Sequence, residues 1–240
     1  MERIILMVIR SIFQLPFWIY KIFKYCNVDK YPEEIRYNFL HKLTTLVNKR
    51  GRVTVSCYGL EHLPKDNGYI MYGNHQGLFD ALILLQTHTR PFTTVSKMEV
   101  KNVFFIKQVF TILQSKFIDR EDVRQSMKVM IEVTKEVKEG RNYLIFPEGT
   151  RSKNGNHLGE FKGGSFKSAM NAKCPIVPIA IIDSFKSFDT HSIKKLNVQV
   201  HYLKPLYYDD YKEMKSGEIA SLVASRIEDT IREYETAQTI

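Results

Sequence analysis

The stretch that decides the fold is "GYIMYGNHQGLFDALILLQ", from Gly68 to Gln86. Its apolar start predicts a short strand over 69–72, and its end predicts a helix over 80–86. Gly77 lies in the polar segment between them and supplies the permissive backbone that a turn requires. A strand that turns directly into a helix is the repeating unit of α/β proteins.

Strands and helices alternate in the same way over most of the remaining chain. Further strands are predicted over 53–58, 92–96, 116–118, 143–146, 176–182 and 196–203. Further helices are predicted over 103–113, 121–138, 165–171 and 216–236. One apolar stripe of 121–138 is expected to face the core, and it consists of Val123, Met127, Met130, Ile131, Thr134 and Val137. A chain of 240 residues, 44% of them hydrophobic, suits one α/β domain with a mixed, largely parallel β-sheet flanked by helices.

The first 50 residues differ from the rest, because they contain two predicted amphipathic helices and no strand. The first helix covers "MERIILMVIRSIFQLPFWIYKIFKY", 1–25, and the second covers 32–48. Charged residues and Pro16 interrupt the first apolar run, so it fits neither a signal peptide nor a transmembrane span of about 20 apolar residues. The predicted organisation is a two-helix membrane-interface motif over 1–50, followed by an α/β domain over 51–240.

In a membrane interface, the apolar side chains of 1–25 would enter the lipid, with Trp18 and Tyr20 at headgroup level. The basic side chains would face anionic phosphates. These basic residues are Arg3, Arg10, Lys21 and Lys24. Packing of this helix on the protein core is the alternative.

The charge of the chain favours an anionic partner. The formal net charge is +9, and the sequence pI is about 9.3. Nucleic acid, phospholipid headgroups and phosphorylated substrates all fit such an excess. The three cysteines are widely spaced and lack the spacing of zinc ligands, so we expect no metal site, no disulfide and a reducing compartment.

The polar turn "NHQGLFD" places His75 and Asp80 five positions apart. Such positions share a face neither of a helix nor of a strand, so the two side chains meet only if the chain turns between them. The carboxylate would then accept a hydrogen bond from one imidazole nitrogen, and the other nitrogen would take a proton. No serine or cysteine lies in this stretch, so that proton would come from a substrate hydroxyl. A helix-capping Asp80 beside a histidine in a polar turn is the alternative.

The stretch "YLIFPEGTRS", 143–152, is a predicted strand that runs directly into Glu148, Gly149, Thr150 and Arg151. Backbone N–H groups, the threonine hydroxyl and the guanidinium can converge there on one phosphate. The glutamate would orient the arginine or bind a substrate hydroxyl. A charged surface turn is the alternative interpretation of this stretch.

Together and in this order, these stretches resemble the glycerophospholipid acyltransferase family, which includes the PlsC-type enzymes. The first family motif, N-H-x4-D, matches Asn74 to Asp80, and the third, F-P-E-G-T-R-S, matches 146–152 without exception. The second motif ends in an arginine after a short strand, as "KFIDR" does with Arg120. Lys97 falls where the family has a lysine beside the substrate phosphate, and "IVPIAI", 176–181, matches the V-P-I strand of the fourth motif.

The resemblance implies an O-acyltransferase. It would move an acyl chain from acyl-coenzyme A or acyl carrier protein to the sn-2 hydroxyl of 1-acyl-sn-glycerol-3-phosphate, and so make phosphatidic acid in phospholipid biosynthesis. His75 would be the catalytic base and Asp80 would polarise it. The implied substrate-binding residues are Lys97, Arg120, Glu148, Gly149, Thr150 and Arg151. The resemblance implies no metal and no prosthetic group.

Lysophosphatidate stays in lipid, so we expect a peripheral or monotopic protein at the cytoplasmic face of the cell membrane, with anionic phospholipids as partners. The sequence leaves open the acyl donor, the acyl-chain length, the oligomeric state and the acceptor, since glycerol-3-phosphate and other lysophospholipids are alternatives. A non-catalytic lipid-binding protein is a rival of another class, but it has no need of His75 and Asp80. A nucleic-acid-binding module would show a basic stripe with interleaved aromatics, whereas these basic residues are dispersed.

Overall fold

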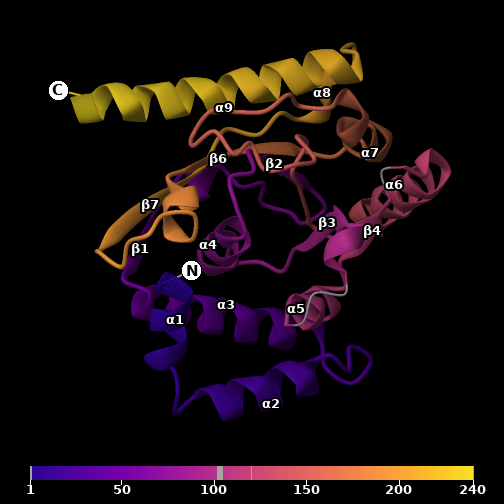
Figure 1. Ribbon diagram of the computed structural model, residues 1–240. Coiled ribbons are helices and arrows are strands. Elements are labelled where there is room, and N and C mark those ends of the chain that lie inside the picture. The colour runs from indigo at the N-terminus through magenta and orange to yellow at the C-terminus, as the bar shows by residue number, and fades with distance from the viewer. Residues whose placement is uncertain (1, 102–104, 120, 240) are drawn as a thin grey trace.

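A seven-stranded sheet forms the centre of the protein (Figure 1). The computed structural model describes residues 2–101, 105–119 and 121–239. The strands are β1 (Val53–Tyr58), β2 (Ile70–Gly73), β3 (Thr93–Lys97), β4 (Lys116–Ile118), β5 (Tyr143–Ile145), β6 (Ile176–Ile182) and β7 (Leu196–Tyr202). All seven predicted strands are present, with ends within one residue of the prediction.

The order of the strands across the sheet is β1-β7-β6-β2-β5-β3-β4. Every neighbouring pair is parallel except β6 and β7, which are antiparallel. The prediction of a mixed, largely parallel sheet is therefore confirmed. The central strands β2, β5 and β6 are buried along their whole length, because helices cover both faces of the sheet.

One hydrophobic cluster lies on each face of the sheet, because successive strand residues point to opposite sides. Met71 and Leu144 pack with α3, α4 and α5, whereas Tyr72 and Ile145 pack with α6, α7 and α9. The helix bounds are α3 (Glu33–Arg50), α4 (Phe79–Thr87), α5 (Ile106–Leu113), α6 (Val123–Lys138), α7 (Lys167–Ala172), α8 (Tyr208–Tyr211) and α9 (Ser216–Thr239). Figure 1 shows α9 along the top of the molecule and α3 below the sheet.

The predicted core face of α6 is wrong for most of its residues, and only Val137 of the predicted stripe is buried. Val123, Met127 and Ile131 are exposed, whereas the side chains that face the sheet are Val129, Val133 and Val137. Both sets repeat every four residues, and they lie about 200° apart around the helix because they are offset by two positions. Spacing alone could not choose between two apolar stripes, and contact with the sheet decides which one is buried.

The prediction of one helix over 1–25 is also wrong. The structure has α1 (Glu2–Ile9) and α2 (Leu15–Tyr25), joined by a turn in which the Ser11 carbonyl accepts hydrogen bonds from the N–H groups of Gln14 and Leu15. Pro16 lies in the first turn of α2, where its missing N–H costs no helical hydrogen bond. With α3, the described part of the first 50 residues therefore contains three helices rather than the predicted two.

Arg3 and Trp18 are buried, which contradicts the prediction that both face a membrane. The guanidinium of Arg3 donates hydrogen bonds to the backbone carbonyls of Gly51, Ser187, Ser192 and Lys194. Trp18 lies beneath the guanidinium of Arg50, with 5.0 Å between the guanidinium carbon and the ring centroid. These two side chains attach the N-terminal helices to the rest of the protein.

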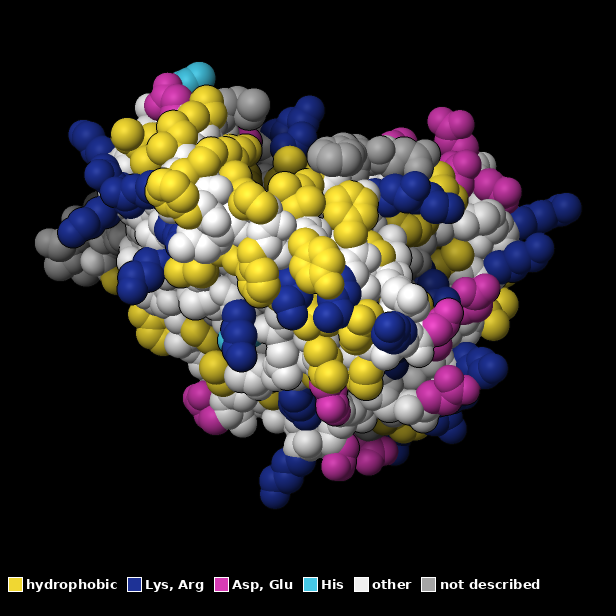
Figure 2. Space-filling view, turned by 90° about the horizontal axis from the view of Figure 1, so that it is seen from below, with side chains coloured by type: hydrophobic (Ala, Val, Ile, Leu, Met, Phe, Trp, Pro, Cys, Tyr) yellow, Lys and Arg dark blue, Asp and Glu magenta, His cyan; other side chains and the backbone are white. Residues whose placement is uncertain are grey.

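Other side chains of α1, α2 and their connecting turn form an exposed apolar surface. Phe13, at the tip of the turn, is 93% exposed. This N-terminal apolar surface consists of Ile5, Val8, Ile9, Ile12, Phe13, Phe17, Ile19, Tyr20 and Phe23. Figure 2 shows hydrophobic side chains gathered on the underside of the molecule, with Lys and Arg side chains among them. Within the described residues, no helix combines the length and the apolar character that crossing a membrane requires.

Candidate active site

The predicted site residues that the structure describes lie at one edge of the sheet. β2, β5 and β3 are parallel neighbours, so the segments that follow Gly73, Ile145 and Lys97 leave the sheet on the same side. The segments after β4 and β6 leave on this side too, because β4 is parallel to β3 and β6 is parallel to β2. The carboxyl ends of parallel strands are the usual place for ligands in α/β proteins.

His75 and Asp80 form the predicted pair at this edge. The distance from His75 Nδ1 to Asp80 Oδ2 is 2.7 Å, and the side chains are 22% and 0% exposed. An ionised carboxylate accepts hydrogen bonds only, so the proton of the neutral imidazole lies on Nδ1. Nε2 then carries the lone pair, and the predicted geometry of the pair is confirmed.

The carboxylate of Asp80 is held by the turn that precedes α4. Oδ2 also accepts hydrogen bonds from the backbone N–H groups of Gln76 at 2.7 Å and Gly77 at 2.9 Å. The hydroxyl of Ser184 donates to the other oxygen, Oδ1. These donors replace the water that a buried carboxylate has lost, and the N-terminus of α4 favours the negative charge. The aspartate can therefore keep a fixed position opposite the imidazole.

Phe146, the first residue after β5, covers one face of the imidazole. The rings of His75 and Phe146 stack with 4.3 Å between centroids and 18° between planes. The phenyl ring restricts rotation of the imidazole and shields that face from water. Together with the hydrogen bond to Asp80, the stacking sets the direction in which Nε2 points.

Glu148 connects the two sequence motifs. Its Oε1 accepts a hydrogen bond from the N–H of His75 at 2.8 Å, and its Oε2 accepts one from the N–H of Gly159 at 2.9 Å. Burial raises the pKa of this carboxyl, and the two N–H donors oppose that rise. The hypothesis that Glu148 orients Arg151 is wrong for the described contacts, because both oxygens bind backbone groups. Glu148 instead fixes the backbone on which His75 is carried.

The rest of the "PEGTR" loop leads outward from the sheet. Gly149 has φ 69°, a left-handed conformation that suits glycine, and its N–H donates to the Phe146 carbonyl at 3.0 Å. Thr150 and Arg151 are exposed, and within the described residues the guanidinium of Arg151 has no hydrogen-bond or ion-pair partner. The N–H of Ser152 donates to the carbonyl of His75 at 2.9 Å, so this loop runs beside the histidine.

Of the two remaining predicted basic residues, only Lys97 is described, and it lies further along the same edge. Lys97 is the last residue of β3 and is partly buried. It is separated from the β2 end of the edge by the intervening strand β5. Arg120 follows β4 and lies outside the described residues.

Sequence reasoning missed Gln76 and Ser184. The amide of Gln76 accepts a hydrogen bond from the N–H of Ser184 at 2.8 Å and donates to the carbonyl of Ile181 and to Oδ1 of Asn156, both at 2.9 Å. Ser184 comes soon after β6, a strand parallel to β2, so its place at this edge could have been inferred. Nothing in the sequence indicates the contact with Asp80.

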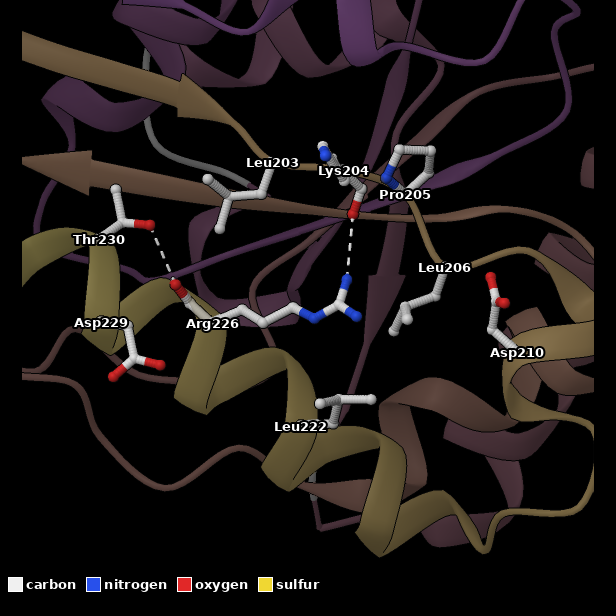
Figure 3. A pocket seen from close by; sticks show the side chains of 9 residues that line it. All are labelled: Leu203, Lys204, Pro205, Leu206, Asp210, Leu222, Arg226, Asp229 and Thr230. Atoms are coloured by element: carbon white, nitrogen blue, oxygen red, sulfur yellow. Dashed lines mark hydrogen bonds between the residues drawn. The ribbon is translucent and has the colours of Figure 1, made fainter.

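The described part of the chain offers no second candidate among its titratable clusters or in the hollow beside α9. Within the described residues, no cluster of three or more His, Cys, Asp and Glu side chains is placed to hold a metal ion. Figure 3 shows a hollow between α9 and the segment that follows β7, where Arg226 Nη1 donates to the Lys204 carbonyl at 3.3 Å. Its lining shares no residue with the histidine–aspartate edge, so the candidate site remains at the carboxyl ends of β2 and β5.

Comparisons with known proteins identify the family to which this chain belongs. The family model described as Acyltransferase matches residues 54–182, which include the histidine–aspartate pair and the "PEGTR" loop. The chain belongs to the acyltransferase family. The resemblance inferred from the motifs is therefore confirmed. The described edge of the sheet is the candidate active site of this acyltransferase.

Curated relatives resemble the acyltransferase over most of its length. A probable 1-acyl-sn-glycerol-3-phosphate acyltransferase of Mycoplasma pneumoniae is 28% identical over 220 residues, which are 86% of this chain and 82% of the relative. A 1-acyl-sn-glycerol-3-phosphate acyltransferase of Borreliella burgdorferi is 27% identical over 177 residues, 73% of this chain and 70% of the relative. The crystal structure of the 1-acyl-sn-glycerophosphate acyltransferase PlsC from Thermotoga maritima has the same fold, with a TM-score of 0.77, 19% identity and coverage of 96% and 95%.

Proposed function

We propose that this acyltransferase transfers an acyl chain from an acyl thioester to the sn-2 hydroxyl of 1-acyl-sn-glycerol-3-phosphate and so makes phosphatidic acid. The observation that carries the proposal is the 2.7 Å contact between His75 and Asp80 beside a loop with an exposed Arg151, which has no partner among the described residues. A base next to an anion-binding group fits an acceptor that carries both a hydroxyl and a phosphate. The names of the relatives support the same acceptor.

The reaction begins with His75. Nε2 removes the proton from the sn-2 hydroxyl as that oxygen attacks the thioester carbonyl carbon, and Asp80 stabilises the imidazolium that forms. The tetrahedral intermediate collapses when its carbon–sulfur bond breaks. The departing thiolate takes the proton from Nε2, so His75 ends the cycle neutral. Stacking on Phe146 keeps the imidazole in one orientation through both proton transfers.

Acceptor binding falls to the basic residues of the same edge. The guanidinium of Arg151 would form charge-assisted hydrogen bonds with the phosphate, assisted by Lys97, Arg120 and the hydroxyl of Thr150. Fixing the phosphate places the sn-2 hydroxyl near Nε2, which lowers the entropic cost of the attack. Glu148 acts on His75 through the backbone. Gly149 provides the turn that brings this loop beside the histidine.

No metal or prosthetic group is required in this mechanism. The thioester is already an activated acyl group, and the histidine supplies the proton transfers. Acyl-coenzyme A or acyl carrier protein serves as co-substrate, and the measurement below separates them.

We further propose that the acyltransferase binds the cytoplasmic face of the cell membrane as a peripheral or monotopic protein. The N-terminal apolar surface would enter the lipid, with exposed Phe13 deepest. Lys21 and Lys24, whose ammonium groups lie over aromatic rings of the N-terminal helices and the segment after them, would contact anionic headgroups. Arg3 and Trp18 have no part in this contact, because they are buried.

The test is acyl transfer by the purified full-length protein in detergent micelles. Lysophosphatidate, glycerol-3-phosphate and lysophosphatidylcholine are each supplied with acyl-coenzyme A and with acylated acyl carrier protein, and the products are separated and identified. Phosphatidate formed from lysophosphatidate at a kcat/KM at least tenfold above the other acceptors supports the proposal. Acylation of another acceptor in preference would reassign the substrate, and no transfer with either donor would contradict the proposed activity.

A further inference from the structure

The second oxygen of the Asp80 carboxylate has a single partner in the described part of the chain. Oδ2 accepts three N–H donors, from the imidazole of His75 and from the backbone of Gln76 and Gly77. Oδ1 accepts only the hydroxyl of Ser184. Asp80 and Ser184 are both fully buried, so water cannot replace that hydroxyl without rearrangement. An unpaired oxygen of a buried carboxylate costs free energy, so the hydrogen bond from Ser184 matters for the position of Asp80.

The backbone before Ser184 is held in an unusual conformation that aims it at Asp80. Asp183 has φ 63°, in the left-handed region that a non-glycine residue rarely adopts. Its carboxylate accepts hydrogen bonds from Asn156 at 3.1 Å and Tyr234 at 3.2 Å, and pairs with Lys186 at 2.8 Å. Strained backbone persists where its surroundings fix it, and it gathers at functional sites. Here it turns the chain at the end of β6 into the short 3-10 helix η4 (Ser184–Ser187).

The far end of η4 is fixed by the N-terminal helix. The guanidinium of Arg3, on α1, donates from Nε to the carbonyl of Ser187 at 3.1 Å and from Nη1 to the carbonyl of Gly51. At the near end, the N–H of Ser184 donates to Gln76, a residue of the catalytic turn. The short helix η4 is thus fixed at Ser184 by Gln76 and at Ser187 by Arg3. These contacts hold the Ser184 hydroxyl next to Asp80.

We propose that Ser184 is a positioning residue for the acyl-transfer reaction: its hydroxyl holds the Asp80 carboxylate in the orientation that receives the Nδ1–H of His75. The serine touches neither substrate nor the reacting atoms, and it acts through Asp80. The inference rests on the proposed role of His75 as the base. Without the hydroxyl, the carboxylate rotates toward other donors or takes up a proton, and the imidazole loses its fixed direction.

Ser187 offers a matched control in the same turn. It is fully buried like Ser184, but its hydroxyl has no hydrogen-bond partner within the described residues. Ser184→Ala and Ser187→Ala each delete one buried hydroxyl from η4, and only the first deletes a contact with Asp80. Ser184→Thr keeps the hydroxyl, and Ser184→Cys replaces it with a weaker donor.

The experiment measures kcat and KM for lysophosphatidate in micelles, with thermal unfolding of each variant. We expect kcat to fall about tenfold or more in Ser184→Ala with KM within about twofold of wild type, since supporting residues of an active site typically contribute 10–100-fold. Ser187→Ala is expected to keep wild-type kcat. Ser184→Thr should restore most of the rate, and Ser184→Cys should fall between threonine and alanine.

Three results would overturn the assignment: an unchanged kcat in Ser184→Ala, an equal loss in Ser187→Ala, or a loss confined to KM. If Ser184→Ala does not fold, the order of kcat in the threonine and cysteine variants decides, because equal rates would also overturn it. His75→Ala, assayed alongside, separates this inference from the proposed function. Full activity in that variant contradicts the base itself, whereas its inactivity beside a fully active Ser184→Ala contradicts the positioning role alone.

Discussion

The two ends of α4 each carry a histidine, and they differ in almost every respect. His75 precedes the N-terminus of the helix, is partly exposed and faces the carboxylate of Asp80. His88 caps the C-terminus, is fully buried and has neutral partners. Its Nε2 lies 2.8 Å from the hydroxyl of Tyr69, and its Nδ1 lies 2.6 Å from the carbonyl of Arg90.

The difference bears on the proposed role of His75 as a base. Burial lowers the pKa of His88 to about 4, so this imidazole stays neutral and serves as a hydrogen-bonding part of the core. Its backbone carbonyl also accepts from the hydroxyl of Tyr37. His75 has a fixed carboxylate at one nitrogen and an accessible side at the other. We propose that a carboxylate partner and partial exposure, rather than the residue type, separate a reactive end of α4 from a structural one.

Removing the charge of the Asp80 carboxylate should leave His75, like His88, without a charged partner. In Asp80→Asn we expect kcat to fall about 10³-fold, since the imidazolium loses its counter-charge and the amide group meets the N–H donors of Gln76 and Gly77. Steady-state acyl transfer measures the loss, with Asp189→Asn, an exposed carboxylate after η4, as the control. A kcat within tenfold of wild type would show that Asp80 is not needed beside His75.

Lowering the pH should destabilise the protein through His88, the buried histidine at the C-terminus of α4. The pKa of His88 is about 4 in the folded protein and about 6.5 in an unfolded chain, so both states are neutral above pH 6.5. Between pH 6.5 and 4, His88 is protonated in the unfolded chain but stays neutral in the folded protein. Up to about 3 kcal/mol of the free energy of unfolding is therefore lost. Denaturant unfolding at pH 7, 6 and 5 measures this loss. His88→Gln should show a shallower dependence on pH, and an unchanged dependence would contradict this role.

The reactive end also differs from the structural end in having an exposed cation beside it. We expect kcat/KM for lysophosphatidate to fall about 100-fold in Arg151→Met, because a charge-assisted contact with the phosphate is lost. Lys153→Met, another exposed cation of the same loop, is expected to stay within about twofold of wild type. Equal losses in the two variants would point to general attraction of the anionic substrate rather than to a phosphate site at Arg151.

The smallest effect is expected furthest from α4, at the N-terminal apolar surface. Phe13→Ser should weaken binding to anionic phospholipid vesicles about tenfold, since one phenyl group no longer enters the lipid. Vesicle co-sedimentation measures the partition, and kcat in detergent micelles should be unchanged. Val123→Ser, which alters another exposed apolar side chain, on α6, serves as the control. A similar loss in both variants would mean that the contact with lipid is not confined to α1 and α2.

The sequence predicted the strands well because buried parallel strands are short, apolar and bounded by turns. It also predicted the contact between His75 and Asp80, since the strand, the turn and the helix are all local. It failed where long-range packing decides between equivalent local patterns. α6 carries two apolar stripes, and only the sheet selects the one that contains Val133.

Long-range hydrogen bonds were the other source of error. Arg3 reads as a surface cation, but carbonyls from three separate segments, at Gly51, Ser187 and 192–194, surround it. From the sequence, Glu148 is expected to pair with Arg151, three positions away. Instead, one of its oxygens accepts a hydrogen bond from the backbone N–H of His75, 73 residues earlier. Ser184 lies 104 residues from Asp80, and no local pattern marks it.

The most direct test of the proposed base compares the loss of each of the two histidines. His75→Ala and His88→Gln are compared in acyl transfer to lysophosphatidate at low temperature and in thermal unfolding. We predict that His75→Ala loses about 10³-fold in kcat and keeps the wild-type melting temperature, whereas His88→Gln keeps kcat and melts at a lower temperature. Retention of more than a tenth of the wild-type kcat in His75→Ala would contradict the claim that His75 is the base.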